Sequence, residues 1–423
     1  MTRVAVIVLG DLGHSPRMSY HALSLANNGA QVDLIGYTGS DLHSSISSNS
    51  NISVHRLNPK IKRSIHNKLF LVLAFFKIFF QFFQFFFLLL RLPRPDYLLL
   101  QNPPSIPLFL VAVLIKIIRK TRLVIDWHNL GFTILELRRK GIVIKLARYY
   151  EKFLGKFGDA HFCVSSAMKK FLVENFAIKN DLITVLYDRP APVFKSLSLI
   201  EKHNFLSKIS PQLNWINHDK MNQSFLTSIN HLGQISRDPD SVLAISSTSW
   251  TPDEDFTPLF NAIKNYNQIS KIQKLPKLYL IITGKGPLKE FFQSKMIDAQ
   301  FDHVMISTPW LTSEDYPFLI GSADFGISLH QSSSGLDLPM KILDMFGCGV
   351  PVFAVDYNCI NELVNENING KIFKNEEDLG KLLVYYVQNL DKLENFKANI
   401  LESLVDNGWI QNWNRKAKTI FGL

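Results

Sequence analysis

The chain has 423 residues, 47% of them hydrophobic and 19% charged, so it is long enough for about two or three domains with large apolar cores. This composition excludes a mainly disordered chain, and its three cysteines are too few for a disulfide-stapled fold. The cysteines also lack the spacing of a zinc site, which favours a reducing compartment. The formal net charge of +10 favours an anionic partner, whether nucleic acid, anionic lipid or a phosphorylated substrate.

The N-terminal part of the chain alternates short β-rich runs with helical runs, which is typical of βαβ units in a parallel, doubly wound sheet. Its first apolar run is too short for the core of a signal peptide and is predicted to be a buried strand. We predict strands at 4–9, 32–35, 52–57, 97–101, 123–126, 160–164 and 183–186, and helices at 18–28 and 145–157.

Residues 69–90 are as long as the roughly 20 apolar residues of a membrane-spanning helix. Their polar members Lys77, Gln81 and Gln84 share one helical face. A crossing helix would also put the strands 52–57 and 97–101 of one sheet on opposite sides of the bilayer, where neither could pair. We therefore predict a helix that lies in the membrane interface, with 106–118 as a second, shorter apolar element.

Basic residues flank the long apolar run and would face anionic headgroups. They are Lys60, Lys62, Arg63, Lys68, Arg91 and Arg94. The alternative is that 69–90 and 106–118 are both buried core helices of a large α/β domain. A nucleic-acid-binding surface is disfavoured, because the basic residues lie beside a phenylalanine-rich helix rather than along an aromatic and basic groove.

A second α/β series follows a polar stretch that lacks strong periodicity. We predict strands at 242–246, 278–283, 304–307, 325–329, 350–353 and 371–373, and helices at 255–267, 288–298, 341–347, 360–364 and 378–389. The predicted organisation is an N-terminal Rossmann-like domain (1–190), a linker with an insertion (191–240), a C-terminal Rossmann-like domain (241–390) and a helical tail that packs back on the first domain (391–423). Such domains place ligands in the cleft at the carboxyl ends of their strands.

In the second domain, two segments have the chemistry of a nucleotide site. Gly284, Lys285 and Gly286 follow a strand and precede a helix, where glycines let backbone N–H groups approach a phosphate. The alternative for this turn is packing alone. A hydroxyl-rich turn, made of Ser332, Ser333, Ser334 and Gly335, precedes the second segment. There Lys341 and Asp344 lie one helical turn apart and suit a diphosphate and a ribose, with a local ion pair as the alternative.

In the first domain, Asp126 and His128 lie two residues apart at the end of a strand and therefore share a face. A carboxylate that fixes the tautomer of an imidazole makes a general base, although the pair could equally cap the strand end. The loop 10–17 follows the first strand and holds Asp11, Gly13 and Arg17. The acidic run 253–255 invites a metal, but its place before a helix favours an N-terminal helix-dipole role instead, so we predict no metal.

These segments resemble the chitobiosyldiphosphodolichol beta-mannosyltransferases. The resemblance rests on GDLGHSPRM (10–18), LQNPPSIP (100–107), VIDWHN (124–129), SSTSWTPDEDF (246–256), ITGKGPL (282–288), TPWL (308–311), EDYP (314–317) and SSSGLDLPMKILDMFGCGVPV (332–352). It covers nearly the whole chain outside 190–240. Family members usually carry an N-terminal transmembrane anchor, whereas this sequence begins at its first predicted strand.

The resemblance implies a GT-B fold, no cofactor, and transfer of mannose from GDP-mannose to dolichyl-diphosphate chitobiose with a β-1,4 linkage. It places the reaction on the cytosolic face of the endoplasmic reticulum, with membrane lipids and other lipid-linked oligosaccharide mannosyltransferases as partners. The change from an α-linked donor to a β-linked product requires one inverting displacement. His128, oriented by Asp126, is the expected base, with Asp11 as its rival, and Arg17 and Gly13 are expected at the acceptor.

The donor would lie against the glycine turn, the serine turn, Lys341 and Asp344. Two other functions remain open at this point. One is a transferase of the same fold that uses another nucleotide sugar or polyprenyl acceptor, because neither Lys341 nor Asp344 distinguishes guanine from uracil. The other is a catalytically silent, membrane-bound partner in a glycosyltransferase assembly.

Overall fold

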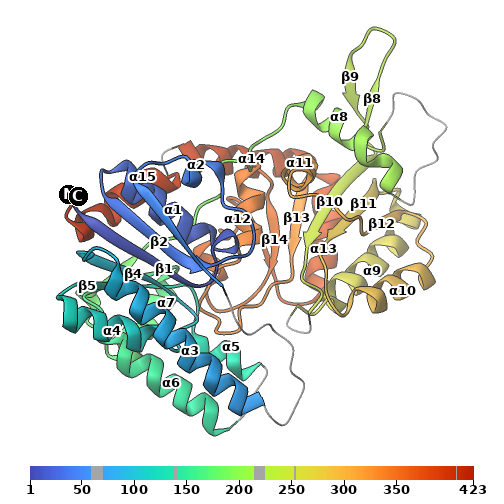
Figure 1. The fold of residues 1–423 in the computed structure, drawn as a ribbon. Helices are drawn as coiled ribbons and strands as arrows, with labels where there is room; N and C mark the ends of the chain where they lie inside the picture. Colours follow the sequence, from blue (N-terminus) through green and yellow to red (C-terminus); the bar gives the residue numbers. More distant parts are fainter. Residues whose placement is uncertain (59–69, 138–140, 214–223, 252–253, 406) are drawn as a thin grey trace. The chain divides into compact units, whose positions relative to one another are not determined.

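The computed structural model describes residues 1–58, 70–137, 141–213, 224–251, 254–405 and 407–423 (Figure 1). Four of the flanking basic residues, Lys60, Lys62, Arg63 and Lys68, lie outside the described residues. The chain divides into two compact units. Unit 1 is Met1–Asp188 with Trp409–Leu423, and unit 2 is Arg189–Gly408.

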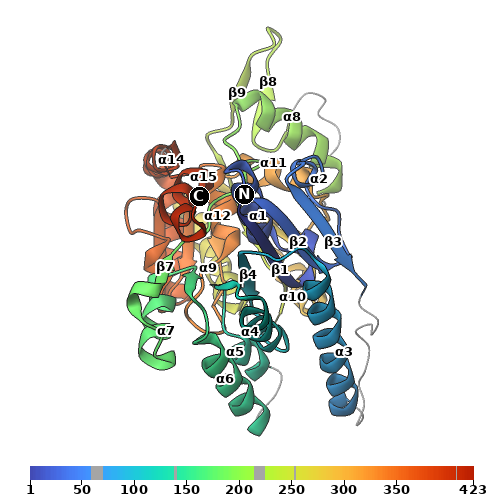
Figure 2. The same cartoon turned by 60° about the vertical axis from the view of Figure 1, so that its left-hand side comes forward.

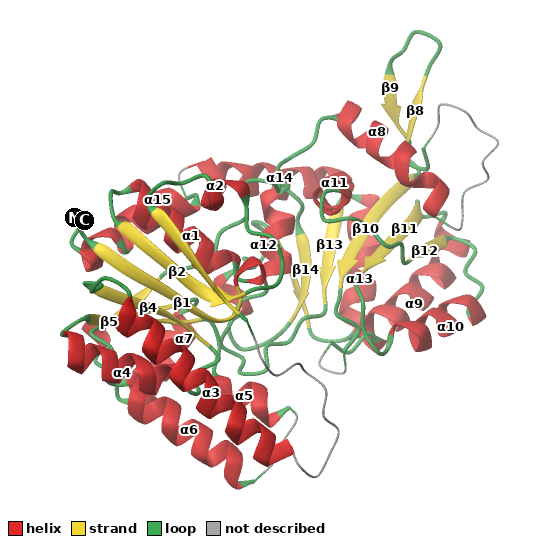
Figure 3. Ribbon diagram, in the orientation of Figure 1, coloured by secondary structure: helices red, strands yellow, loops and turns green. Residues whose placement is uncertain are grey.

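Unit 1 is built on a parallel sheet, of which Figure 3 labels β1, β2, β4 and β5. Its described strands follow the order β3-β2-β1-β4-β5-β6-β7. The strands are β1 (Arg3–Asp11), β2 (Gln31–Tyr37), β3 (Ile52–Leu57), β4 (Tyr97–Asn102), β5 (Arg122–Trp127), β6 (Ala160–Cys163) and β7 (Ile183–Val185). All predicted strands of this half are confirmed. The inner strands are apolar on both faces, as in β4, where Leu98, Leu99 and Leu100 are fully buried, because helices cover both sides of a parallel sheet.

Helices connect the strands of unit 1. They are α1 (Pro16–Asn27), α2 (Ser44–Ser47), α3 (Phe70–Arg91), α4 (Leu108–Arg119), α5 (Gly131–Glu136), α6 (Ile142–Gly155), α7 (Ser166–Phe176) and the C-terminal α15 (Trp409–Lys416). Short 3₁₀ turns lie at Leu12–His14, Asn180–Leu182 and Lys418–Phe421. Helix α1 begins with a proline and buries Met18, Ala22 and Leu25 at helical spacing. Trp413 and Phe421 of the C-terminal segment join the same core.

Unit 2 contains a second parallel sheet, with described strands in the order β12-β11-β10-β13-β14-β15. Its strands are β10 (Ser241–Ser247), β11 (Lys277–Thr283), β12 (Val304–Ser307), β13 (Phe325–Ser328), β14 (Val352–Val355) and β15 (Gly370–Phe373). Its helices are α9 (Thr257–Gln273), α10 (Lys289–Asp298), α11 (Asp315–Ser322), α12 (Met340–Gly347), α13 (Glu376–Gln388) and α14 (Leu390–Val405). The predicted helix at 360–364 is instead a short 3₁₀ turn, Ile360–Glu362.

The segment expected to be a linker has structure of its own. It forms α8 (Leu199–Ile209), a 3₁₀ turn at Ser210–Gln212 and an antiparallel hairpin of β8 (Thr227–Ile229) and β9 (Ile235–Arg237). Leu206 and Ile209 of α8 pack in one core with Leu243 and Leu319, so this segment belongs to the fold of unit 2. The expected C-terminal tail is divided, because α14 lies in unit 2 and α15 lies in unit 1.

Helix α3 presents an apolar surface to the outside of unit 1. Phe75, Phe76 and Phe79 are 64%, 58% and 54% exposed, whereas Phe85 and Leu89 are buried. Among the described residues, one helix is long and apolar enough to cross a membrane, Leu73–Arg91, and only 11% of its most apolar window is buried. The helix connects β3 and β4, which belong to one sheet, so crossing a bilayer would divide that sheet.

The second predicted membrane element is not confirmed along its length. Helix α4 buries Leu108, Phe109 and Val111 and exposes mainly its last turn, so most of it is a core helix. It packs against α3 on one side and α6 on the other (Figure 2). Helix α6 instead presents an exposed apolar stripe at helical spacing, formed by Ile142, Leu146, Tyr149 and Phe153.

Candidate active site

The carboxylate of Asp126 is the centre of a buried network at the carboxyl end of β5. Its Oδ2 atom lies 2.8 Å from Nε2 of His128 and 3.1 Å from Nε2 of His21. Arg17 donates to both carboxylate oxygens, from Nε at 2.8 Å and from Nη2 at 2.9 Å. Burial alone would raise the pKa of Asp126, but the neighbouring positive charge of Arg17 and the bonds from the histidines keep it well below its usual value. The carboxylate is therefore ionised.

The tautomer of the buried His21 follows from its second partner. The indole N–H of Trp413 lies 3.0 Å from Nδ1 of His21 and can only donate, so Nδ1 is unprotonated and Nε2–H donates to Asp126. Burial lowers the pKa of His21, with Asp126 opposing this effect, and the ring stays neutral. His128 likewise places Nε2 on Asp126, which leaves its Nδ1 without a partner among the described residues.

Arg17 occupies a different place from the one expected for an acceptor-binding residue. Its side chain is buried, and Nη1 donates to Asp188 at 2.8 Å while the rest of the guanidinium holds Asp126. The Cζ atom of Arg17 lies over the ring of Trp409, 5.4 Å from its centroid. Arg17 therefore positions Asp126, and the expectation that it meets the acceptor diphosphate is corrected.

Asp11 and His14 form a second carboxylate–histidine pair, which follows β1. Oδ2 of Asp11 lies 2.6 Å from Nδ1 of His14 and also accepts from the backbone N–H of Ser40 at 2.9 Å. Burial opposes ionisation of Asp11, but the bonds from Ser40, His14 and Gly13 lower its pKa to about 2. A carboxylate with that pKa is a weak base near neutral pH, so the geometry favours a histidine as the base.

Gly13 lies under the loop that follows β2. A Cβ atom at this position would come within 2.7 Å of the Cβ of Ser40 and 2.8 Å of the carbonyl oxygen of Asp41. Its N–H donates to Asp11 at 3.0 Å. This close packing is enough to require a glycine at position 13, whether or not an acceptor substrate binds there. The role of Gly13 in binding the acceptor substrate stays a prediction.

In unit 2, the turn after β11 packs directly on the loop after β10. Gly284 has a φ of +128°, and a Cβ there would lie 1.7 Å from the carbonyl oxygen of Thr248. A Cβ on Gly286 would lie 1.8 Å from the carbonyl oxygen of Ser249. Only glycine fits at either position. Between them, Nζ of Lys285 lies over the ring of Trp310, 3.5 Å from its centroid.

Glu254 connects this loop to α12. Its Oε1 atom lies 2.5 Å from Nζ of Lys341, while Oε2 accepts from Oγ1 of Thr248 and the backbone N–H of Ser249, both at 2.5 Å. Burial opposes ionisation, but bonds from His330 and the charge of Lys341 hold the pKa of Glu254 far below its usual value. The expected role of Glu254 at the helix N-terminus is therefore wrong, although Asp255 does accept from the backbone N–H of Thr257. Asp253 lies outside the described residues.

Asp344 is not the ion-pair partner of Lys341, whose charge meets Glu254 instead. Burial raises the pKa of Asp344 to about 7, and among the residues that the structure describes no hydrogen bond or nearby cation offsets that burial. The carboxyl of Asp344 can accept a hydrogen bond from a ligand hydroxyl, and it accepts more strongly once it is ionised. This chemistry fits the predicted ribose contact.

The serine turn is held by its own hydroxyls. Ser332 donates to Asp337, and Ser334 donates to the same carboxylate oxygen at 3.3 Å. The backbone N–H of Gly335 donates to Oγ of Ser332 at 3.0 Å. The hydroxyls of Ser332 and Ser334 thus shape the turn, and their contact with the donor stays a prediction. Ser333 and Gly335 stay predicted donor contacts.

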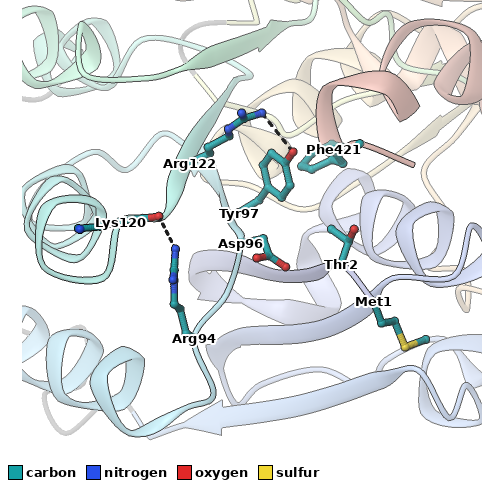
Figure 4. Close-up of a pocket in the computed structure, with 9 residues that line it drawn as sticks. Met1, Thr2, Arg94, Asp96, Tyr97, Lys120, Arg122 and Phe421 are labelled. Carbon is teal, nitrogen blue, oxygen red and sulfur yellow. Dashed lines mark hydrogen bonds between the residues drawn. The ribbon is translucent and has the colours of Figure 1, made fainter.

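A basic pocket of about 530 Å³ lies in unit 1 at the amino ends of β4 and β5, whereas the site around Asp126 lies at the carboxyl end of β5 (Figure 4). Its lining includes Arg94, Asp96, Lys120 and Arg122, and Arg94 donates to the carbonyl oxygen of Lys120 at 2.9 Å. These residues precede or begin β4 and β5, whereas His128 follows β5. The pocket is therefore separate from the site around Asp126. In the described part of the chain, no cluster of three or more His, Cys, Asp and Glu side chains could hold a metal ion.

Two family models match the chain, Glycosyltransferase Family 4 over residues 17–188 and Glycosyl transferases group 1 over residues 257–402. A chitobiosyldiphosphodolichol beta-mannosyltransferase of Kluyveromyces lactis is 40% identical over 97% of this chain and 88% of its own length. The mouse protein of the same name is 37% identical over 97% of this chain and 87% of its own. This chain belongs to the chitobiosyldiphosphodolichol beta-mannosyltransferase family.

A further relative of this chain, from Arabidopsis thaliana, is named UDP-glycosyltransferase TURAN. It is 37% identical over 99% of this chain and 97% of its own length. Among solved structures, Anabaena HepE in complex with UDP has a TM-score of 0.66 at 13% identity, covering 100% of both chains. WaaG has a TM-score of 0.63 at 11% identity, covering 98% of both chains. These similarities show the fold, and they confirm the predicted GT-B class.

Several polar residues that organise the hydrogen-bond networks of the two units were not among the site residues predicted from the sequence. His21 and Trp413 act on Asp126, and Glu254 and Asp337 act on the two unit 2 segments. His21 lies four residues after Arg17 in α1, a helical spacing that could have suggested a shared partner. Trp413 lies so far along the chain that no local pattern indicates its contact.

Proposed function

We propose that this protein is an inverting hexosyltransferase that transfers mannose from GDP-mannose to dolichyl-diphosphate chitobiose, forming a β-1,4 linkage. The observation that carries the proposal is the near full-length similarity to relatives that are named for this activity. The buried network around Asp126 and the glycine turn of unit 2 supply chemistry that suits it.

The acceptor step requires a base, and we assign it to His128. The ionised Asp126 holds Nε2–H of His128, so Nδ1 is free to take the proton from the acceptor O4 hydroxyl. The new bond from O4 to the mannose C1 forms as the bond from C1 to the diphosphate oxygen breaks. The electron pair leaves with GDP, and the configuration at C1 inverts.

The donor step requires stabilisation of the departing diphosphate. Backbone N–H groups of the turn around Gly284 and Gly286, together with Lys285 and Lys341, would meet its charge. Glu254 holds Lys341 in place before the donor binds. Asp344 would accept from the ribose hydroxyls.

We also propose that the protein acts at the endoplasmic reticulum membrane, with its site on the cytosolic side. The exposed phenylalanines of α3 and the apolar stripe of α6 support a membrane-docking face. The exposed Arg91, at the end of α3, would add attraction to anionic headgroups.

The test is a transfer assay with the full chain, radiolabelled GDP-mannose and phytanyl-diphosphate chitobiose. We expect a product that β-mannosidase cleaves and α-mannosidase does not. The runner-up donor, a UDP-sugar, is favoured only by the name of the Arabidopsis relative. Transfer from UDP-sugars alone would overturn the assignment of GDP-mannose, and no transfer from any nucleotide sugar would overturn the proposed enzyme.

A further inference from the structure

A groove of about 710 Å³ opens in unit 1 among α3, α5, α6 and the segment that follows β4. Ile78 of α3, Ile134 of α5, and Val143 and Ala147 of α6 line its walls. None of the described side chains that line it carries a charge. Its volume is in the range of sites that hold small ligands, whose walls are mostly apolar.

The groove lining includes residues that lie close in sequence to the proposed base. Ser105 and Gly131 belong to its lining, and they lie three residues after β4 ends and three residues after His128. The backbone N–H of His128 donates to the carbonyl oxygen of Asn102 at 2.8 Å, so the loops after β4 and β5 are tied together.

A buried carboxylate holds these loops in place. Glu151 of α6 accepts from the side chain of Asn102 at 2.5 Å and from the backbone N–H of Gly131 at 2.9 Å. Burial raises the pKa of Glu151, and these bonds oppose that rise. Helix α6 therefore forms part of the groove wall and also holds the loops after β4 and β5 through Glu151.

The groove also borders the exposed apolar face of unit 1. Phe75 of α3 and Leu146 of α6 line the groove and are also 64% and 61% exposed. The same two helices carry the exposed side chains that we assign to membrane docking. The groove is thus lined both by residues of the exposed apolar face and by the loops after β4 and β5.

We propose that this groove binds the isoprenoid chain of the lipid-linked acceptor next to its diphosphate, an inference that rests on the proposed function. The occupant must be apolar along its length, emerge from the lipid phase and end in a polar group beside His128. A polyprenyl diphosphate sugar meets all three conditions. An apolar protein helix meets the first but brings no sugar to the base.

The test compares two acceptors in detergent solution, chitobiosyl diphosphate with a phytanyl chain and with a hexyl chain. Val143→Gln combined with Ile134→Gln makes the groove polar at partly exposed positions, so the fold should tolerate it. We expect the KM for the phytanyl acceptor to rise about tenfold and that for the hexyl acceptor to change less than twofold. Ile272→Gln alters an exposed apolar residue of unit 2 outside the groove lining and the docking face, and it should leave both KM values unchanged.

A second measurement does not depend on transfer. A polyprenyl diphosphate with a diazirine on its isoprenoid chain should label peptides of α5 and α6, and the double variant should abolish that labelling. Labelling without any mannose transfer would retain the groove and remove the proposed function. Equal KM increases for both acceptors, or labelling confined to residues outside the groove, would overturn the groove as the chain site.

Discussion

The indole nitrogen of Trp413 lies 3.0 Å from Nδ1 of His21, so a residue near the C-terminus determines which proton His21 offers to Asp126. Asp126 in turn holds His128 at 2.8 Å. A chain of directed hydrogen bonds therefore runs from α15 to the proposed base. The donor and acceptor roles of these partners set the tautomers of His21 and His128.

Replacing Trp413 tests this chain. Trp413→Phe keeps a ring but leaves Nδ1 of His21 buried without a donor, which costs about 1–3 kcal/mol. Trp409→Phe is the matched control, because it removes a buried indole bond to Ser24 instead. We expect similar losses of stability in chemical denaturation but a larger fall in kcat for Trp413→Phe. Equal kcat values in the two variants would contradict the chain.

The base assignment predicts a hierarchy among three histidine and carboxylate variants. His128→Ala should lower kcat by about 10²–10⁴-fold with little change in the melting temperature, since the ring is partly exposed. His14→Ala and Asp11→Asn should retain most of the activity. The transfer assay decides between them, and a large loss in His14→Ala with full activity in His128→Ala would move the base to the end of β1.

The raised pKa of Asp344 predicts a pH-dependent affinity for GDP. Its pKa is about 7 in the free protein, and a ribose hydroxyl donates a much stronger hydrogen bond to the ionised carboxylate than to the neutral acid. Affinity should therefore rise about tenfold from about pH 6 to about pH 8 in calorimetric titrations. Asp344→Asn should bind more weakly and show no such rise. A variant that retained the full pH dependence would exclude Asp344 as its source.

The same shift carries a stability prediction for the unliganded protein. The folded pKa lies above the unfolded value near 3.8, so the folded state retains a proton that the unfolded state has lost between about pH 4 and pH 7. Stability should fall as the pH rises through that window. Asp344→Asn should flatten this part of the profile in denaturant titrations.

Gly284→Ala is expected to damage the donor side. Its Cβ would lie 1.7 Å from the carbonyl oxygen of Thr248, so the turn must move off the loop after β10. Affinity for GDP and the melting temperature should both fall. Gly233→Ala is the control, because Gly233 also has a positive φ but nothing lies near its Cβ position. A Gly284→Ala protein with unchanged affinity for GDP would show that this turn does not contact the donor.

The membrane-docking face predicts weaker binding to vesicles after removal of exposed aromatics. Phe75→Gln with Phe79→Gln should reduce co-sedimentation with anionic phosphatidylserine vesicles by about tenfold or more. Ile272→Gln removes an apolar side chain of unit 2 that is 84% exposed and should have no effect. Unchanged sedimentation of the double variant would exclude α3 as the docking element.

Local pattern alone predicted the strands and the two Rossmann-like sheets, and the resemblance of the motifs indicated the family. Alternation of β-rich runs with helices predicts a parallel sheet, and the glycine turn at Gly284 and Gly286 follows from its place between β11 and α10. The apolar face of α3 was also predicted, because Lys77, Gln81 and Gln84 lie on one helical face and leave the rest of the helix rich in phenylalanine. These features depend on spacing within a few turns of chain.

Only the tertiary structure decided which polar groups meet. Arg17 carries a charge that suggests a diphosphate, yet Asp126 and Asp188 surround it, because a buried guanidinium needs carboxylate partners. Lys341 was placed beside Asp344 by helical spacing, but Glu254 offers the closer carboxylate from another loop. Such pairs join residues distant in the chain, and their energy depends on burial and direction, which a linear sequence does not contain.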